Sequence, residues 1–183
     1  MVEDIKPVRR IIAGNDSNGD AVILEDKPSP DVKTYDNRPG FSATRIWVQE
    51  ATPAPIAGVQ DTLHLPDTLE PPPAGSVCRF ITIPPDAWDS DGVTEEKVSD
   101  YFEAAGSPGA FRPGSAHPYM QNTNTLDYVF IMEGDITLVL ESEEVQLSTG
   151  DTVVQLGTTH AWSNRSDVPC RLFISSHDGS KLN

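Results

Sequence analysis

The chain has 183 residues, which is enough for one domain with a substantial core and too few for two domains of ordinary size. Its 28 acidic residues outnumber the 13 lysines and arginines, so the formal net charge is -15. A charge of this sign repels phosphate backbones and anionic lipid surfaces, and neither nucleic acid nor a membrane is therefore an expected partner.

The cellular setting is indicated by the amino-terminal residues and by the two cysteines. The charged residues of MVEDIKPVRR are not followed by the apolar stretch of a secretory signal, and no apolar run is long enough to cross a bilayer. Cys78 and Cys170 lie inside apolar runs, where a thiol behaves as a small hydrophobic side chain, so a disulfide is possible but not implied. These features favour a cytoplasmic, reducing environment.

The first elements expected are the two strands of a β-hairpin. Residues 8–13 and 21–25 are rich in β-branched side chains, and the connecting GNDSNGD consists of residues that tolerate turn conformations. In residues 27–40 the hydrophobic residues follow neither the helical nor the strand periodicity, which predicts a loop that covers one edge of a sheet. A strand with Trp47 at its centre follows at residues 44–49.

A proline-rich connection and a helix separate the two halves of the chain. Residues 51–75 carry prolines that cannot sit inside a sheet, so we expect this segment to wrap the outside of the fold or to reach a partner subunit. Residues 76–83 form the next strand. A helix is expected over residues 94–105, with Thr94 as its cap and Gly106 at its end, and its short length suggests a lid beside a sheet.

The second half of the chain consists of short strands at even spacing. Apolar runs separated by Gly-Asp or acidic turn signals predict a meander of antiparallel strands. The predicted strands are residues 128–132, 136–140, 144–147, 152–156 and 170–175. About ten short strands and one helix indicate an all-β barrel or sandwich.

Two polar clusters within this meander resemble the sequence motifs of the cupin superfamily. Asp127 precedes Gly134 by seven positions, as in the first motif, and the second motif is matched by Gly150, Gly157, His160 and Asn164. HPYMQNTNTLDY followed by GDTVVQLGTTHAWSN is similar to a subgroup of small single-domain cupins. The resemblance implies a cupin jelly-roll β-barrel with an N-terminal strand extension and one short helix.

The same resemblance implies how the chain is divided. A single cupin domain would span residues 1–183, and residues 111–178 would hold the barrel motifs. Residues 1–110 would then supply the N-terminal extension, the outer strands, the proline-rich connection and the helix.

Alternation along the strand before Gly134 predicts which side chains share a face. Asp127 lies on one face of the strand, and Gln121, Thr123 and Thr125 join it if the preceding segment is extended. The resemblance implies that this face lines the barrel interior opposite His160. Trp162, two residues after His160, would lie on the same side as His160 if that segment is extended. An acid, an amide, hydroxyls and an imidazole in an apolar cavity are typical of a small-molecule site.

The sequence does not decide between metal binding and metal-free acid–base chemistry in this pocket. Metal-binding cupins usually carry histidines before the acidic residue, where this chain has Gln121 and Thr123, so the first metal motif is degenerate. A divalent transition metal could bind His117, Asp127 and His160 only if the preceding strand bends to bring His117 inward. Without a metal, Asp127 and His160 could act as base and acid, or could form hydrogen bonds that only satisfy buried polar groups.

Three further residues are candidates for substrate binding. Along its predicted strand, Arg79 alternates in step with the apolar Val77 and Ile81 and would share their face. If that face points inward, Arg79 would bind a substrate carboxylate or form an ion pair with an acidic neighbour. Trp47 and Trp162 would stack on a ligand in the cavity or belong to the core.

These observations leave three hypotheses for the function. The first is a non-redox enzyme of isomerase, dehydratase, decarboxylase or cyclase type that acts on a carbonyl-bearing compound. The second is a metal-dependent cupin such as a dioxygenase, and the third is a non-catalytic small-molecule binding cupin. A homodimer is expected because the proline-rich connection needs a surface to lie on and cupin-like barrels often pair through sheet edges.

Overall fold

The computed structural model describes residues 7–56, 62–89 and 92–180. Within them the chain forms strands, one α-helix and two short 3-10 helices, η1 (Asp86–Trp88) and η2 (Pro108–Ala110). The remaining elements are β1 (Arg9–Asn15), β2 (Ala21–Pro28), β3 (Val32–Thr34), β4 (Ser42–Gln49), β5 (Ser76–Ile83), α1 (Glu95–Ala104), β6 (Thr125–Glu133), β7 (Asp135–Leu140), β8 (Glu144–Ser148), β9 (Thr152–Leu156), β10 (His160–Ser163) and β11 (Cys170–Asp178).

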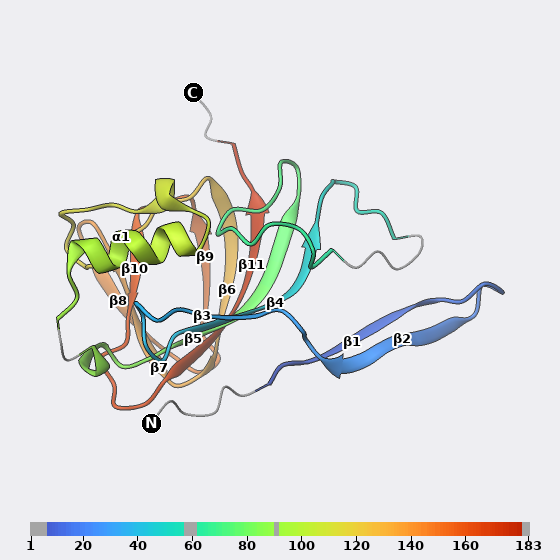
Figure 1. Cartoon of the computed structure of the whole chain (residues 1–183), viewed down its shortest axis with the longest axis horizontal. Helices are drawn as coiled ribbons and strands as arrows, with labels where there is room; N and C mark the ends of the chain where they lie inside the picture. The colour runs from blue at the N-terminus through green and yellow to red at the C-terminus, as the bar shows by residue number, and fades with distance from the viewer. Residues whose placement is uncertain (1–6, 57–61, 90–91, 181–183) are drawn as a thin grey trace.

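Two antiparallel sheets form the body of the molecule (Figure 1). The larger sheet has the strand order β3-β4-β5-β11-β6-β9, and the smaller has the order β10-β7-β8. Along β5 and β6 buried residues alternate with more exposed ones, because successive side chains of a strand point to opposite faces. The prediction of an all-β fold is therefore confirmed.

Gly134 makes the tight turn from β6 into β7. Its φ of +82° lies in the left-handed region, which side chains with a Cβ rarely adopt. A Cβ at this position would also lie 3.2 Å from the carbonyl oxygen of Pro169 and 3.3 Å from Cα of Cys170. Glycine is thus required both by the turn and by the close approach of the chain that enters β11.

The predicted hairpin is confirmed as β1 and β2, which pair in antiparallel register and project away from the sheets (Figure 1). Arg10 anchors the base of this hairpin, since its buried side chain donates to Glu25 at 2.7 Å and to the carbonyl of Ile46 at 3.2 Å. The hairpin is an extension of the fold and contributes no residue to the cavity described below.

The predicted helix is confirmed as α1. Thr94 caps it by accepting a hydrogen bond from the backbone N–H of Lys97 at 3.3 Å, and Gly106 follows its end with a φ of +67°. Tyr101 meets Phe41 edge to face at 5.5 Å, and Phe102 stacks on Phe111 at 5.3 Å between ring centroids. These contacts fix α1 to the barrel.

Three segments between the predicted strands differ from what the sequence predicts. Residues 27–40 contain β3, a three-residue edge strand that pairs with β4. No strand was predicted within the second polar cluster, but it contains β10, which pairs with β7 through four residue pairs. In the proline-rich connection, the described residues 62–69 lie against the barrel, because buried arginines bind their carbonyl oxygens, and Asp67 and Leu69 line the cavity.

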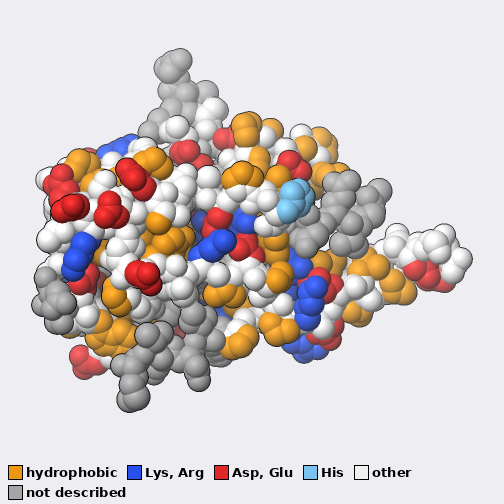
Figure 2. All heavy atoms as spheres, viewed as in Figure 1, with side chains coloured by type: hydrophobic (Ala, Val, Ile, Leu, Met, Phe, Trp, Pro, Cys, Tyr) orange, Lys and Arg blue, Asp and Glu red, His pale blue; other side chains and the backbone are white. Residues whose placement is uncertain are grey.

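The surface is acidic without a single acidic block. Acidic side chains are scattered over the face that Figure 2 shows, and several lie in the region of α1. In the part of the chain that the structure describes, no helix is both long and apolar enough to span a membrane.

Candidate functional site

A cavity of about 80 Å³ lies between the two sheets. Its walls carry apolar side chains from several strands and a group of polar ones. The polar lining includes Arg79 of β5, Gln121 and Thr123 before β6, Asp127 of β6, Gln155 of β9 and His160 of β10. At about 30 Å³ for each water molecule, this volume corresponds to about three waters, which is enough for a small polar molecule or the reactive end of a larger one.

His160 enters this cavity from the smaller sheet, and its hydrogen bonds define its tautomer. Its Nδ1 lies 2.9 Å from the carbonyl oxygen of Thr158, which can only accept, so Nδ1 carries the proton. In the neutral ring Nε2 is then an acceptor, and it lies 3.2 Å from the amide nitrogen of Gln121. Burial lowers the pKa of His160, while the Thr158 carbonyl and the Asp127 carboxylate partly oppose this effect.

Asp127 enters from the opposite wall, on the larger sheet. Its Oδ2 accepts a hydrogen bond from Thr125 at 2.9 Å, and the hydroxyl of Thr125 lies 2.7 Å from that of Thr123. Its Oδ1 is buried and has no hydrogen-bond partner. The structure thus brings Asp127 and His160 into one cavity and places Thr125 beside Asp127, outside the lining.

Arg79 is the buried cation of the cavity wall. Its Nη2 donates to the carbonyls of Thr68 at 2.7 Å and Leu69 at 3.4 Å, and its Nε has no partner. In the part of the chain that the structure describes, no carboxylate lies within ion-pair distance of Arg79, so the expected ion pair is replaced by carbonyl contacts. Burial lowers the pKa of this guanidinium; Asp67 opposes the shift and Arg45 adds to it.

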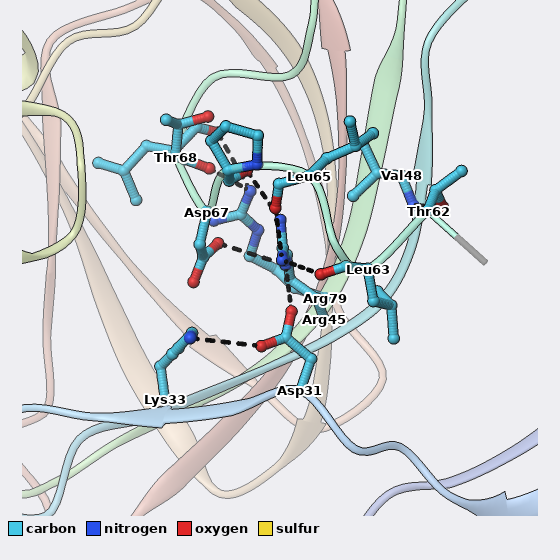
Figure 3. A network of polar contacts seen from close by, with 12 residues as sticks. Asp31, Lys33, Arg45, Val48, Thr62, Leu63, Leu65, Asp67, Thr68 and Arg79 are labelled. Atoms are coloured by element: carbon cyan, nitrogen blue, oxygen red, sulfur yellow. Dashed lines mark hydrogen bonds and ion pairs between the residues drawn. The ribbon is translucent and has the colours of Figure 1, made fainter.

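Arg45 fixes the described part of the proline-rich connection beside Arg79 (Figure 3). Its guanidinium donates to the carbonyls of Leu63 at 2.8 Å, Leu65 at 3.0 Å and Pro66 at 2.9 Å. Asp31 pairs with the same guanidinium, and Asp67 approaches it to 3.5 Å. This network closes one side of the cavity with main chain from the connection between β4 and β5.

The two candidate tryptophans lie in different environments. Trp162 lines the cavity, with its ring centroid 5.9 Å from that of His160, on the side of His160 as expected. Trp47 is not among the lining residues, because a bulge between Arg45 and Trp47 shifts the register of β4. After the bulge Val48 points inward in its place, and Val48 is buried.

Several lining residues were missed by the sequence reasoning. Gln155 pairs with Asp127 across β9 and β6, and alternation along residues 152–156 could have identified it. Arg38 lies over the ring of Tyr119 at 3.9 Å at the edge of the cavity, and no local pattern indicates this contact.

The comparisons with known proteins bear on the family. Residues 110–176 match the family model of the cupin domain, Cupin_2. Phomopsin biosynthesis cluster protein C' of Diaporthe leptostromiformis is 30% identical over 156 residues, which cover 78% of this chain and 77% of that protein. The chain belongs to the cupin family. Oryzines biosynthesis cluster protein J of Aspergillus oryzae is 26% identical over 170 residues, covering 90% of this cupin and 78% of that protein.

Solved structures of cupins resemble this one at low identity. The cupin domain of Schizosaccharomyces pombe Cnp3 is 8% identical, with a TM-score of 0.44 and coverage of 93% of this chain and 87% of that chain. A cupin 2 conserved barrel domain protein from Salinispora arenicola is 12% identical, with a TM-score of 0.39 and coverage of 80% and 87%.

The side chains of this cupin do not fit the metal site that was expected from the resemblance to metal-binding cupins. His117 lines a neighbouring pocket of about 400 Å³ instead of the cavity, and its Nδ1 accepts from the backbone N–H of Tyr119 at 3.2 Å. Within the described residues, no three His, Cys, Asp or Glu side chains are grouped to share a metal ion. The expected set of His117, Asp127 and His160 is therefore not brought together.

Proposed function

We propose that this cupin is a non-redox enzyme of isomerase, dehydratase, decarboxylase or cyclase type that acts on a small carbonyl-bearing compound. One observation carries the proposal: an unpartnered carboxylate oxygen of Asp127 and a neutral imidazole of His160 meet in one cavity from opposite walls. The names of the fungal relatives, which refer to biosynthesis clusters, are consistent with a small-molecule substrate.

In this proposal Asp127 is the base. Its Oδ1 takes a proton from the carbon beside the carbonyl group, and the electron pair moves onto the carbonyl oxygen. The Nε–H of Arg79 donates to that oxygen and stabilises its negative charge. The proton then returns to another carbon in an isomerisation, or to a departing hydroxyl group in a dehydration.

The other candidate residues position these groups. Thr125 holds Oδ2 of Asp127, so that Oδ1 faces the substrate. Gln121 donates to Nε2 of His160, and when the amide turns aside this nitrogen can accept the proton of a substrate hydroxyl. Thr123 and Trp162 complete the surface against which the substrate lies.

Proton exchange tests the proposal without knowledge of the natural substrate. Pyruvate, 2-oxobutanoate and dihydroxyacetone are incubated with the protein in deuterium oxide, and loss of the proton signal beside the carbonyl is followed by NMR. We expect faster exchange of at least one compound, reduced about 100-fold or more in Asp127→Asn. Compounds that bind without any exchange would favour the non-catalytic binding cupin.

A further inference from the structure

Across the described residues, three buried side-chain nitrogen or oxygen atoms have no hydrogen-bond partner, and all three belong to residues that line this one cavity. They are Nε of Arg79, Oδ1 of Asp127 and Oε1 of Gln155. Each of these residues is at least nine-tenths buried, with exposed fractions of 6%, 7% and 4% respectively. A buried polar atom without a hydrogen-bond partner lowers the stability of the folded protein. These three atoms therefore indicate which hydrogen-bond donors and acceptors a ligand should supply.

The two acceptor atoms lie on neighbouring strands. Asp127 of β6 and Gln155 of β9 are directly opposed in the antiparallel register, and both side chains face the cavity. Side chains in such a pair start about 5 Å apart at Cβ. These two oxygens both accept hydrogen bonds, so they cannot form one with each other. An O–H or N–H group of a ligand could donate a hydrogen bond to either oxygen or to both.

The donor atom lies further along the same sheet. Arg79 of β5 is separated from β6 by β11, and the two strand spacings amount to about 10 Å. Its Nη2 is already bound to the carbonyls of Thr68 and Leu69, whereas its buried Nε has no partner and can donate to a ligand oxygen. A positively charged donor prefers a carboxylate to a neutral carbonyl.

We propose that the ligand of this cavity is a short hydroxy acid whose carboxylate accepts from Arg79 and whose hydroxyl donates to Asp127 and Gln155. The inference rests on the proposed function, because it assumes that the cavity binds a small molecule. It goes further in naming the substrate class: the carboxylate supplies the carbonyl oxygen that accepts from Arg79, and the hydroxyl beside Asp127 is the departing group of the proposed dehydration. It also assigns Gln155 a role in selecting that hydroxyl.

Matched acids test this inference. Acetate, propanoate and butanoate are compared with glycolate, 3-hydroxypropanoate and 4-hydroxybutanoate, and binding is followed through the indole N–H signal of Trp162 by NMR. We expect the hydroxy acid to bind about tenfold tighter than its plain partner for at least one chain length, the effect of one hydrogen bond to a charged group. The comparison uses the wild-type protein and needs no variant.

The variant Gln155→Met tests whether Gln155 causes the tighter binding of the hydroxy acid. Gln155→Met preserves the volume of the side chain and removes its acceptor, so the advantage of the hydroxy acid should fall while the affinity for the plain acid stays the same. Gln146→Met, at an exposed position on β8, should leave both affinities unchanged.

Two results would overturn the inference. If hydroxy and plain acids bind equally, no ligand hydroxyl donates to Asp127 and Gln155, and the cavity remains a binding site for acids. If neither series binds, the ligand is not an acid. The exchange of dihydroxyacetone, which carries no carboxylate, then decides separately whether the proposed function survives.

Discussion

The amide nitrogen of Gln121 lies 3.2 Å from Nε2 of His160, so a side chain in the degenerate metal motif donates a hydrogen bond to the imidazole. A metal ion would need that same lone pair of Nε2. The bond between Nδ1 and the Thr158 carbonyl fixes the other side of the ring. In this cupin, His160 is therefore arranged as a neutral proton acceptor.

The first prediction concerns the tautomer of His160. Nitrogen-15 NMR of the imidazole should show a protonated Nδ1 and an unprotonated Nε2 at neutral pH, because the Thr158 carbonyl can only accept. Burial lowers the pKa of His160 below its usual 6.5, so the ring should titrate below that value. A spectrum with the proton on Nε2 would contradict the assignment.

The second prediction links the same residue to stability. Above about pH 6.5 His160 is neutral in both the folded and the unfolded protein. As the pH falls below this value the unfolded chain binds the proton first, so the free energy of unfolding should decrease until the folded pKa is reached. His117, whose pKa is also lowered by burial, contributes in the same direction.

Urea unfolding between about pH 7.5 and about pH 5.5 measures this dependence. His160→Gln should flatten it, and the slope that remains includes the contribution of His117. Gln146→Met, at an exposed position on β8, should keep the slope of the wild-type protein. Equal slopes for wild type and His160→Gln would show that burial does not disfavour the charged form of this ring.

Much of the barrel could be predicted because its strands and turns are marked by patterns among neighbouring residues in the sequence. Alternation placed Thr123, Thr125 and Asp127 on one buried face, and glycine after β6 marked the turn at Gly134. Trp47 could not be placed in this way. A single extra residue in β4 reverses the parity of every later side chain, and no local feature of TRIWVQ reveals it.

The wall formed by the connection depends on contacts between distant parts of the chain. Arg45 binds the carbonyls of Leu63 and Leu65, which are 18 and 20 residues away. Since a main-chain carbonyl is present at every residue, the sequence does not indicate which ones an arginine will bind. The role of residues 62–69 in the cavity was therefore visible only in the structure.

The third prediction concerns Asn164, the last residue of the second cupin motif. It is completely buried, donates to the carbonyls of Ile83 at 3.0 Å and Val168 at 2.9 Å, and accepts from Ser166. Asn164→Ala should lower the free energy of unfolding by about 3 kcal/mol, since buried groups lose their partners. Asn124→Ala, at an exposed position, should change it by less than about 0.5 kcal/mol in the same urea titration.

The fourth prediction concerns Arg45. Arg45→Met removes the donors that bind the connection and leaves the largely buried Asp31 without its main partner, so the loss should be about 3–5 kcal/mol. Limited proteolysis should then cut within residues 62–69 faster than in the wild-type protein. Lys33→Met removes the exposed partner of Asp31 and should cost at most about 1 kcal/mol without faster cleavage.

The last prediction concerns assembly and starts from the outer face of the larger sheet. Phe80 of β5 and Phe130 of β6 both pack against Phe173 of β11, with centroid distances of 5.2 Å and 6.1 Å. Tyr128 and Val154 extend this apolar band to β9, with exposed fractions of 39% and 61%. The band carries no acidic side chain, so two copies with a charge of -15 each could meet there without opposing carboxylates.

We propose that this cupin forms a homodimer through this apolar band, in which each copy covers the other. Light scattering at micromolar concentration should give twice the chain mass of 19.9 kDa for the wild-type protein. Phe130→Glu should give the mass of a single chain, because it places a carboxylate at the centre of the band. Val145→Glu, at an exposed apolar position on the other sheet, should remain dimeric, and a monomeric wild type would refute the proposal.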